Sequence, residues 1–358
     1  MTTAPQVNKH FTFHVVSLPH TQTIAEQSWC AFTQKVRKFC DMMKSLDHTV
    51  YLYASEQNEA ACDELITCIT QDEQAHWDLP GNMDNFQFSP DAPYFKLFNA
   101  RATQAIRERS NPGDIICIIG GRSQMSIAEL NPTLLASEFG IGYCGTFAQY
   151  KVFESYAWMH TVYGAQKRSD CDGEWNDAVI PNYFEVDHFD FQPVKETPPY
   201  LLYLGRLITR KGVNIAMELA NNLRMPLKVA GGQQAPDVNL KRPFVEFVGP
   251  VGPKERSKLM GNATALLCPT IYLEPFGAIA VEAQMCGTPA ISTDWGGFTE
   301  TIEPKFRCRS FGEFVSAIEL AKSYGEADYA ALRARTVEKY SCETIKWDYQ
   351  RYYERITS

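Results

Sequence analysis

The sequence lacks any long hydrophobic run: no stretch approaches the roughly 18 apolar residues that a membrane-spanning helix needs. The opening residues, MTTAPQVNKH, also lack the apolar core of a signal peptide. The 11 cysteines are scattered and form no Cys-x-x-Cys pair, which argues against a disulfide framework or a zinc site. We therefore expect a cytoplasmic protein with reduced, mostly buried thiols and no transmembrane segment.

Basic residues are also fewer than acidic residues. The chain has 34 Lys and Arg against 42 Asp and Glu, a formal net charge of -8, so it carries no strong nucleic-acid signal. Hydrophobic residues make up 45% and charged residues 21%, as in ordinary globular proteins. A chain of 358 residues is long enough for two domains, each with its own core.

Short apolar runs alternate with helical patterns along the whole chain, which predicts an α/β protein with parallel sheets. Residues 114–119 (DIICII), for example, are almost continuously apolar, as central parallel strands are. In the first half we expect strands at 11–18, 49–54, 114–119 and 138–144, helices at 28–45, 58–70, 95–108 and 131–137, and an irregular segment at 74–93. In the second half we expect strands at 200–204, 226–230, 245–248, 264–268 and 289–293, and helices at 213–222, 253–260, 277–286, 311–322 and 329–340.

Residues 273–286 (LEPFGAIAVEAQMC) place two carboxylates around the start of a predicted helix. The N–H groups and dipole of a helix N-terminus favour an anion such as a diphosphate. Glu274 precedes the helix, where it can accept hydrogen bonds from sugar hydroxyls. Glu282 lies about two turns into it, within reach of a ribose. Taken singly, Glu274 is equally explained as a first-turn helix stabiliser and Glu282 as a solvated surface residue.

A second block, residues 200–212 (YLLYLGRLITRKG), follows a predicted strand with glycine and basic residues. An Arg206 guanidinium and a Lys211 ammonium can neutralise a leaving group that gains negative charge. Gly231 and Gly232 end another strand, where a nucleotide phosphate or ribose could pass close to the backbone. Two solvated basic residues in a loop remain the alternative.

A third block, residues 178–189 (AVIPNYFEVDHF), closes the first half. In order and spacing, the three blocks resemble the retaining GT-B glycosyltransferases of the large Glu-x7-Glu group, the family 4-like or group 1 enzymes. The stretches LPHTQT, GIGYCGTF and VFESYAWMHTVYG are similar to a bacterial or phage-type branch of that group. The resemblance implies two Rossmann-like domains facing a cleft: an acceptor-side domain at 1–190 and a donor-binding domain at 191–340. It further implies that a terminal helix at 341–358 crosses back to the first domain.

The resemblance also implies roles for the donor-side residues. Arg206 and Lys211 would hold the diphosphate and, with Glu274, would belong to the catalytic set. Glu282 would bind the ribose. The remaining donor-binding residues are Gly205, Gly231, Gly232, Phe276, Gly277 and Ala278.

Acceptor-side candidates lie at predicted strand ends of the first half, where open parallel sheets bind ligands. They are His20 and Thr21, Gly121 and Arg122, and the pair Glu154 and His160 among aromatic residues. An imidazole there could help a proton leave the acceptor, so His160 is also a catalytic candidate. Each of them could instead be a turn, surface or hydrogen-bonded core residue. The loop after the first strand lacks the glycine-rich sequence that is common in GT-B proteins.

These patterns predict a retaining glycosyltransferase that moves a hexose-type sugar from a nucleotide sugar to a glycan or other cell-surface or phage-related hydroxyl. No Asp-x-Asp motif accompanies the two donor-side blocks, so we expect no metal and no cofactor. The alternatives are a nucleotide-sugar epimerase or a phosphorylase on the same fold, a DNA-base glycosyltransferase, and a catalytically silent nucleotide-sugar-binding protein. The donor, the acceptor and the oligomeric state stay open.

Overall fold

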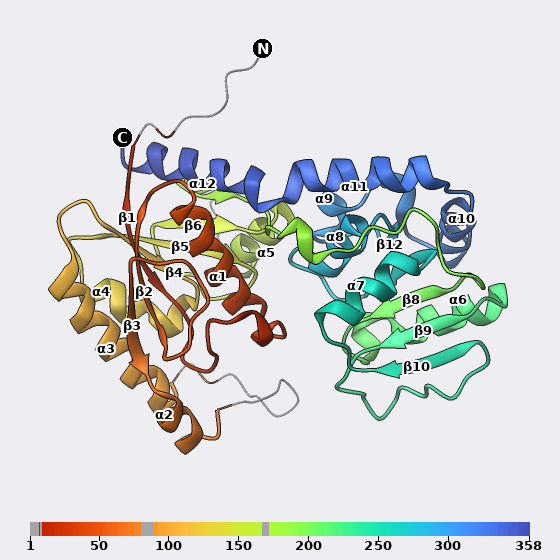
Figure 1. Cartoon of the computed structure of the whole chain (residues 1–358), viewed down its shortest axis with the longest axis horizontal. Coiled ribbons are helices and arrows are strands. Elements are labelled where there is room, and N and C mark those ends of the chain that lie inside the picture. The colour runs from red at the N-terminus through yellow and green to blue at the C-terminus, as the bar shows by residue number, and fades with distance from the viewer. Residues whose placement is uncertain (1–6, 8, 80–88, 90, 167–171) are drawn as a thin grey trace, which may run out of the picture. The chain divides into compact units, whose positions relative to one another are not determined.

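The computed structural model describes residues 7, 9–79, 89, 91–166 and 172–358. The chain divides into two compact units (Figure 1): unit 1 comprises Met1–Tyr183 with Cys342–Ser358, and unit 2 comprises Phe184–Ser341. The first boundary falls seven residues before the predicted one at 190. Phe184 belongs to unit 2 because it packs there with Phe276, and its N–H donates to the Tyr340 carbonyl at 2.9 Å.

Unit 1 contains a parallel sheet with the strand order β3-β2-β1-β4-β5-β6-β7 in the described residues. Its strands are β1 Thr12–Val16, β2 Thr49–Ser55, β3 Glu64–Ile69, β4 Ile115–Ile118, β5 Leu135–Ile141, β6 Tyr150–Phe153 and β7 Ala178–Val179. Its helices are α1 Ala31–Lys44, α2 Gln71–His76, α3 Pro93–Arg109, α4 Met125–Glu129, α5 Tyr156–Ala165 and α12 Cys342–Ile356.

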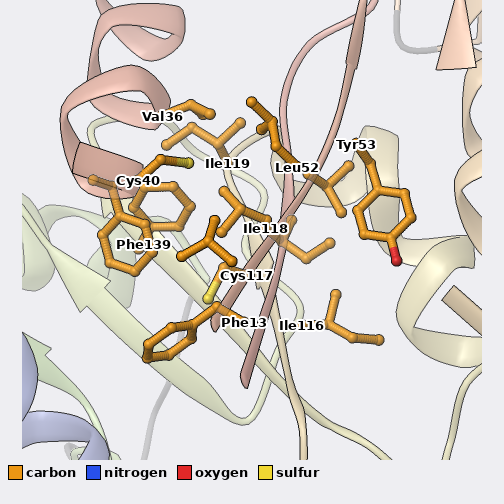
Figure 2. Close-up of a cluster of buried hydrophobic side chains, with 14 of the residues drawn as sticks. Phe13, Val36, Cys40, Leu52, Tyr53, Ile116, Cys117, Ile118, Ile119 and Phe139 are labelled. Atoms are coloured by element: carbon orange, nitrogen blue, oxygen red, sulfur yellow. The ribbon is translucent and has the colours of Figure 1, made fainter. Parts of the chain in front are cut away.

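Apolar side chains cover both faces of this sheet. Figure 2 shows Val36 and Cys40 of α1 with Phe139 on one side of the strands, and Tyr53 on the other. Helix α12 contributes to the first of these layers: the Tyr353 ring lies 4.8 Å from that of Phe13. The C-terminal helix is therefore part of the core of unit 1.

Two elements of unit 1 differ from the prediction. The predicted helix at 58–70 is wrong, because Glu64–Ile69 form β3 beside β2. The predicted helix at 131–137 is also wrong. Asn131 does not start a helix: its side-chain amide donates to the Ile127 carbonyl at 2.7 Å and closes α4, after which β5 begins at Leu135.

The segment at 74–93 is partly helical rather than irregular. Thr70 caps α2 by accepting a hydrogen bond from the Glu73 N–H, and the Glu73 carboxylate accepts one from the Thr70 N–H in return. Residues 80–88 and 90 of this segment lie outside the described residues.

Unit 2 contains a second parallel sheet, ordered β10-β9-β8-β11-β12-β13 in the described residues. Its strands are β8 Leu201–Leu204, β9 Leu227–Ala230, β10 Val245–Gly249, β11 Ala265–Cys268, β12 Ala290–Thr293 and β13 Arg307–Cys308. Its helices are α6 Val213–Leu223, α7 Pro253–Asn262, α8 Ala278–Met285, α9 Phe298–Thr301, α10 Phe311–Lys322 and α11 Glu326–Tyr340. The alternation predicted for the second half is confirmed strand by strand. Among the described helices, none combines the length and the apolar character needed to span a bilayer.

Candidate functional site

Three loops of unit 2 meet at the carboxyl edge of its sheet, where open α/β sheets bind ligands. The N–H groups of Ile271 and Tyr272, after β11, both donate to the Arg210 carbonyl, after β8, at 3.1 Å. The Gly297 N–H, after β12, donates to the Glu274 carbonyl at 2.7 Å. The backbone thus joins the loops after β8, β11 and β12 into one surface. We call these loops, residues 205–212, 269–277 and 294–297, the donor loops, after the role that the sequence analysis predicts for them.

Lys211 and Glu274 form an ion pair on this surface, with Nζ of Lys211 2.5 Å from Oε2 of Glu274. Both side chains are about one-fifth exposed. The ring of Tyr272 lies under the cation, 4.8 Å from Nζ of Lys211. Lys211 and Glu274 are therefore in direct contact although they lie 63 positions apart in the sequence. The sequence analysis assigned both residues to the same reaction centre.

Arg206 lies exposed in the loop after β8. The Tyr203 hydroxyl donates to the Arg206 carbonyl at 2.9 Å, which fixes the backbone of this loop from inside the sheet. The neighbouring loop is tied to it, because the Leu207 N–H donates to the Gly232 carbonyl at 3.0 Å. The structure therefore places a guanidinium in the same loop as Lys211.

Two glycines of the site have no room for a side chain. Gly231 has φ +148°, and a Cβ there would lie 1.8 Å from the Gly205 carbonyl oxygen. Gly277 has φ +83°, and its Cβ would lie 2.3 Å from the Phe298 ring. Glycine is required at both positions by conformation and by space. The close approach of Gly231 to Gly205 also brings the ends of β8 and β9 together.

Helix α8 begins directly after Gly277, so its N-terminus, starting at Ala278, faces the end of the Glu274 loop. The Phe276 side chain is buried, 6.3 Å from the Phe184 ring and 5.7 Å from the Tyr340 ring. Phe276 therefore anchors the loop through its side chain. A helix N-terminus held in this way is suited to an anion.

Glu282 lies further along α8 and has a partner that the sequence analysis missed. Nε of Arg256, in α7, is 3.2 Å from Oε2 of Glu282, whose side chain is 14% exposed. The contact is an ion pair without hydrogen-bond geometry: Oε2 of Glu282 is buried and has no hydrogen-bond partner among the described residues. The sequence did contain a signal for Arg256. This residue lies in the first turn of the helix after strand 245–248, and that position indicates a second basic residue near the donor loops.

In unit 1, the loop after β1 is locked by side chains. The Gln74 amide donates to the Pro19 carbonyl at 2.8 Å and to the Ser55 hydroxyl at 3.0 Å. The Thr21 and Thr33 hydroxyls share a 2.5 Å hydrogen bond. These contacts hold a loop that lacks the usual glycines, and they leave Thr21 buried.

His20 lies in the same loop, 4% exposed, against the rings of Trp29 and Phe95 and near the Cys30 thiol. Burial lowers the pKa of His20 to about 4, because the imidazolium would lose its water. His20 is therefore neutral at physiological pH.

The other acceptor-side candidates differ in accessibility. Gly121 packs against the Tyr143 ring, whereas the Arg122 side chain beside it is exposed. His160 is exposed on α5, with its ring 6.4 Å from that of Tyr156.

Glu154 is buried in an ion pair with Lys35, and it also accepts a hydrogen bond from the Asn182 amide at 3.0 Å. A carboxylate held on both oxygens inside the core supports unit 1. In the described residues, no group of three or more His, Cys, Asp or Glu side chains is arranged to hold a metal ion. Metal independence stays a prediction.

Comparison with known sequences finds a family match that spans this site. Residues 185–324 match the family described as "Glycosyl transferases group 1". The glycogen synthase of Mycobacterium tuberculosis strain H37Rv is 34% identical over 139 residues, which cover 35% of this chain and 33% of that protein. The phosphatidyl-myo-inositol mannosyltransferase of Mycobacterium leprae is 26% identical over 237 residues, covering 56% and 61%. The chain thus spans about a third of the length of the first relative and under two thirds of the second.

Solved structures resemble the whole chain. AviGT4, a glycosyltransferase involved in avilamycin A biosynthesis, superposes with a TM-score of 0.69 at 18% identity, covering 97% of this chain and 98% of that one. Anabaena HepE, solved in complex with UDP and glucose, has a TM-score of 0.64 at 15% identity, covering 98% and 100%. At these identities the likeness concerns the fold. The chain accordingly has the GT-B fold of two Rossmann-like domains, and its residues 185–324 match the family of glycosyl transferases group 1.

Proposed function

We propose that the protein is a retaining glycosyltransferase that moves a hexose-type sugar from a nucleoside diphosphate sugar to a hydroxyl of a glycan or other cell-surface acceptor. The observation that carries the proposal is the contact between Lys211 and Glu274, 2.5 Å apart at the carboxyl edge of the second sheet. It combines a cation for a diphosphate and a carboxylate for sugar hydroxyls at one point. The group 1 family match over residues 185–324 supports the same reaction class.

The proposed division of labour follows from the chemistry of each group. Arg206, Lys211 and the N-terminus of α8 bind the diphosphate and stabilise the negative charge that it gains as the glycosidic bond breaks. Glu274 accepts hydrogen bonds from the sugar and positions its anomeric carbon. Glu282, oriented by Arg256, accepts hydrogen bonds from the ribose.

Retention follows if the acceptor hydroxyl attacks from the face that the leaving group departs from. The acceptor oxygen then forms the new bond to the anomeric carbon while the bond to the diphosphate breaks, and a diphosphate oxygen takes the hydroxyl proton. This route needs no protein base. It fits a donor surface that supplies cations together with a carboxylate already engaged with Lys211.

A donor screen tests the proposal. The purified protein is mixed with UDP-, GDP- and ADP-sugars, and both melting temperature and nucleotide release are measured. One donor should raise the melting temperature by mass action, and Arg206→Ala should remove that shift. Glu274→Gln should keep donor binding but lower slow donor hydrolysis by about 100-fold or more. Hydrolysis should persist in EDTA, because cations of the chain take the place of a metal.

Matched variants make the screen decisive. Lys254→Ala and Glu255→Gln change exposed residues of α7 and should behave as wild type. The donor site is refuted if no nucleotide sugar stabilises the wild type. Binding without turnover under any acceptor would instead identify a catalytically silent nucleotide-sugar-binding protein. Activity lost in EDTA and restored by Mg²⁺ would refute metal independence.

A further inference from the structure

A second hollow lies within unit 2, between the segment that follows β12 and helix α11. It has a volume of about 400 Å³ and is lined by both polar and apolar residues, the polar ones including Thr299, Glu300, Glu303, Arg307, Arg335 and Lys339. None of these residues belongs to the donor loops defined above. We call this hollow the α9–α11 pocket.

The cations of the α9–α11 pocket are incompletely neutralised. The Arg307 side chain is only 18% exposed, and its Nε is buried without a hydrogen-bond acceptor among the described residues. Its nearest carboxylate is that of Asp294, at 3.5 Å. Asp294 binds Arg309 more closely, at 2.8 Å. Arg307 is therefore a largely buried guanidinium that donates to the Thr299 carbonyl at 2.9 Å and has only the more distant Asp294 as a counter-ion.

Lys339 differs from Arg307 in that its side chain is exposed. Its ammonium donates to the Glu300 carbonyl at 2.8 Å, and no carboxylate of the described residues lies within ion-pair distance of it. Loss of water around the ammonium lowers the pKa of Lys339. The third cation, Arg335, pairs with Glu303 at 3.1 Å, and Glu303 is shared with Lys305 at 3.3 Å.

We propose that the α9–α11 pocket binds a compact phosphate-bearing anion, and that this binding is coupled to the donor loops. A tetrahedral oxyanion presents several acceptors to guanidinium and ammonium donors, and its charge adds to the partial neutralisation that Asp294 gives Arg307 and Glu300 gives Lys339. The anion could be free phosphate or the phosphate group of a metabolite, since the shared chemistry is the same.

One wall of the pocket is also the support of the donor loops. The Thr301 hydroxyl, at the end of α9, lies 3.3 Å from the Phe276 carbonyl and 3.2 Å from the Gly297 carbonyl, as donor to both. The Gly297 N–H in turn donates to the Glu274 carbonyl. Helix α8 packs against both α9 and α11 (Figure 1). A ligand that shifts α9 therefore acts on the backbone that positions Glu274.

Tyr340 provides a second link. Its hydroxyl donates to the Glu300 carbonyl at 2.9 Å on the pocket side, and its ring packs edge-on against Phe276 at 5.7 Å. The Glu300 carbonyl also accepts the hydrogen bond of Lys339. An anion that draws Lys339 away from this carbonyl changes a contact shared with Tyr340. The coupling part of the proposal rests on the proposed donor function, whereas phosphate binding does not.

Thermal unfolding with inorganic phosphate, against chloride at equal ionic strength, tests the binding. Phosphate should raise the melting temperature of the wild type and of Arg206→Ala, because Arg206 belongs to the donor site. Lys339→Gln and Arg307→Gln should each lower the affinity for phosphate by about tenfold or more, because each removes a charged hydrogen bond to the anion. The amide of Lys339→Gln can still donate to Glu300, and Lys322→Gln on α10 is the exposed control.

Two outcomes overturn the binding proposal. One is the absence of a phosphate-specific shift in the wild type. The other is a shift that Arg206→Ala abolishes and Lys339→Gln preserves, which would place phosphate in the donor site alone. Arg335→Gln provides a further pocket variant if either of the first two does not fold, as judged by circular dichroism without phosphate.

The coupling is measured separately by calorimetry. Saturating phosphate should change donor affinity by about fivefold or more in the wild type and leave it unchanged in Lys339→Gln. Because coupled binding is thermodynamically reciprocal, the donor must change the affinity for phosphate by the same factor. Unchanged donor affinity would overturn the coupling. If no donor binds at all, the proposed function fails, while the phosphate measurements still decide whether the pocket is an anion site.

Discussion

At the scale of single residues, the proposed donor site depends on backbone segments that approach each other too closely for any residue but glycine. Gly231 shows this most clearly, since its Cα lies against the Gly205 carbonyl in a conformation that L side chains rarely adopt. The cost of a methyl group there includes both the clash and the backbone strain.

Gly231→Ala should therefore destabilise the protein by about 2–4 kcal/mol, as measured by chemical denaturation. Gly252 is the matched control, because its φ is -74° and a Cβ there would meet nothing within 4 Å. We expect Gly252→Ala to change the free energy of unfolding by less than about 0.5 kcal/mol. Equal effects of the two substitutions would contradict the close approach of β8 and β9.

Sequence reasoning worked best for residues whose position in the fold is set locally. Arg206, Lys211 and Glu274 follow buried strands, and parallel strands bring such positions to one edge. It missed the partners that only packing reveals. Arg256 contacts Glu282 because α7 and α8 are neighbours, and Glu154 is buried because Lys35 of α1 meets it from across the sheet. Neither contact has a local pattern in the sequence.

At the scale of elements, the errors have physical causes. Cys62, Leu65, Ile66 and Ile69 recur at the three- and four-residue spacing of a helix, but pairing with β2 outweighs that local pattern and makes Glu64–Ile69 an edge strand. Asn131 is a good residue for either end of a helix, and the structure uses it at the end of α4. Strands with continuous apolar runs, such as β4, were predicted well because burial on both faces leaves no other choice.

The loop after β1 should make unit 1 sensitive to acid. The pKa of His20 is lowered to about 4 in the folded state, so the unfolded state binds the proton more tightly. Neutral His20 therefore contributes its full stabilisation above the unfolded pKa of about 6.5. As the pH falls from 6.5 toward 4, the free energy of unfolding should decrease by on the order of 3 kcal/mol.

Denaturation as a function of pH checks this expectation. His20→Phe should flatten the profile between pH 6.5 and 4, whereas His160→Gln, which changes an exposed histidine, should leave it as in wild type. His14 and His48 are also buried with a lowered pKa, so some pH dependence remains in every variant. Identical profiles for wild type and His20→Phe would refute the assignment.

At the scale of the molecule, unit 1 is built from two separate parts of the chain. Helix α12 completes its core: the Phe39 ring lies 5.1 Å from that of Tyr349, and Gln350 accepts a hydrogen bond from His48 at 2.6 Å. His48 can donate there because its other ring nitrogen accepts the Phe11 N–H. The resemblance to GT-B proteins was needed to expect this return of the chain, since nothing in residues 341–358 alone indicates their partner.

Tyr353→Ala should cost unit 1 about 3–5 kcal/mol, because it removes a fully buried ring from the centre of the α12 contact. Tyr156→Ala, at a position 58% exposed, serves as the control and should cost under about 1 kcal/mol. Both are measured by urea unfolding followed by circular dichroism. A small effect of Tyr353→Ala would mean that α12 only covers the unit and does not hold it together.

The discontinuity of unit 1 has a consequence for synthesis on the ribosome. Residues 184–341 form a contiguous unit that can fold as soon as it emerges, but unit 1 must wait for Tyr349 and Tyr353. At about 5–20 residues per second, its apolar layer stays uncovered for roughly ten seconds or more after Tyr183 is made. Most of unit 1 is therefore translated before unit 2 but becomes native after it, and protection of that layer by chaperones should govern the yield of the protein in the cell.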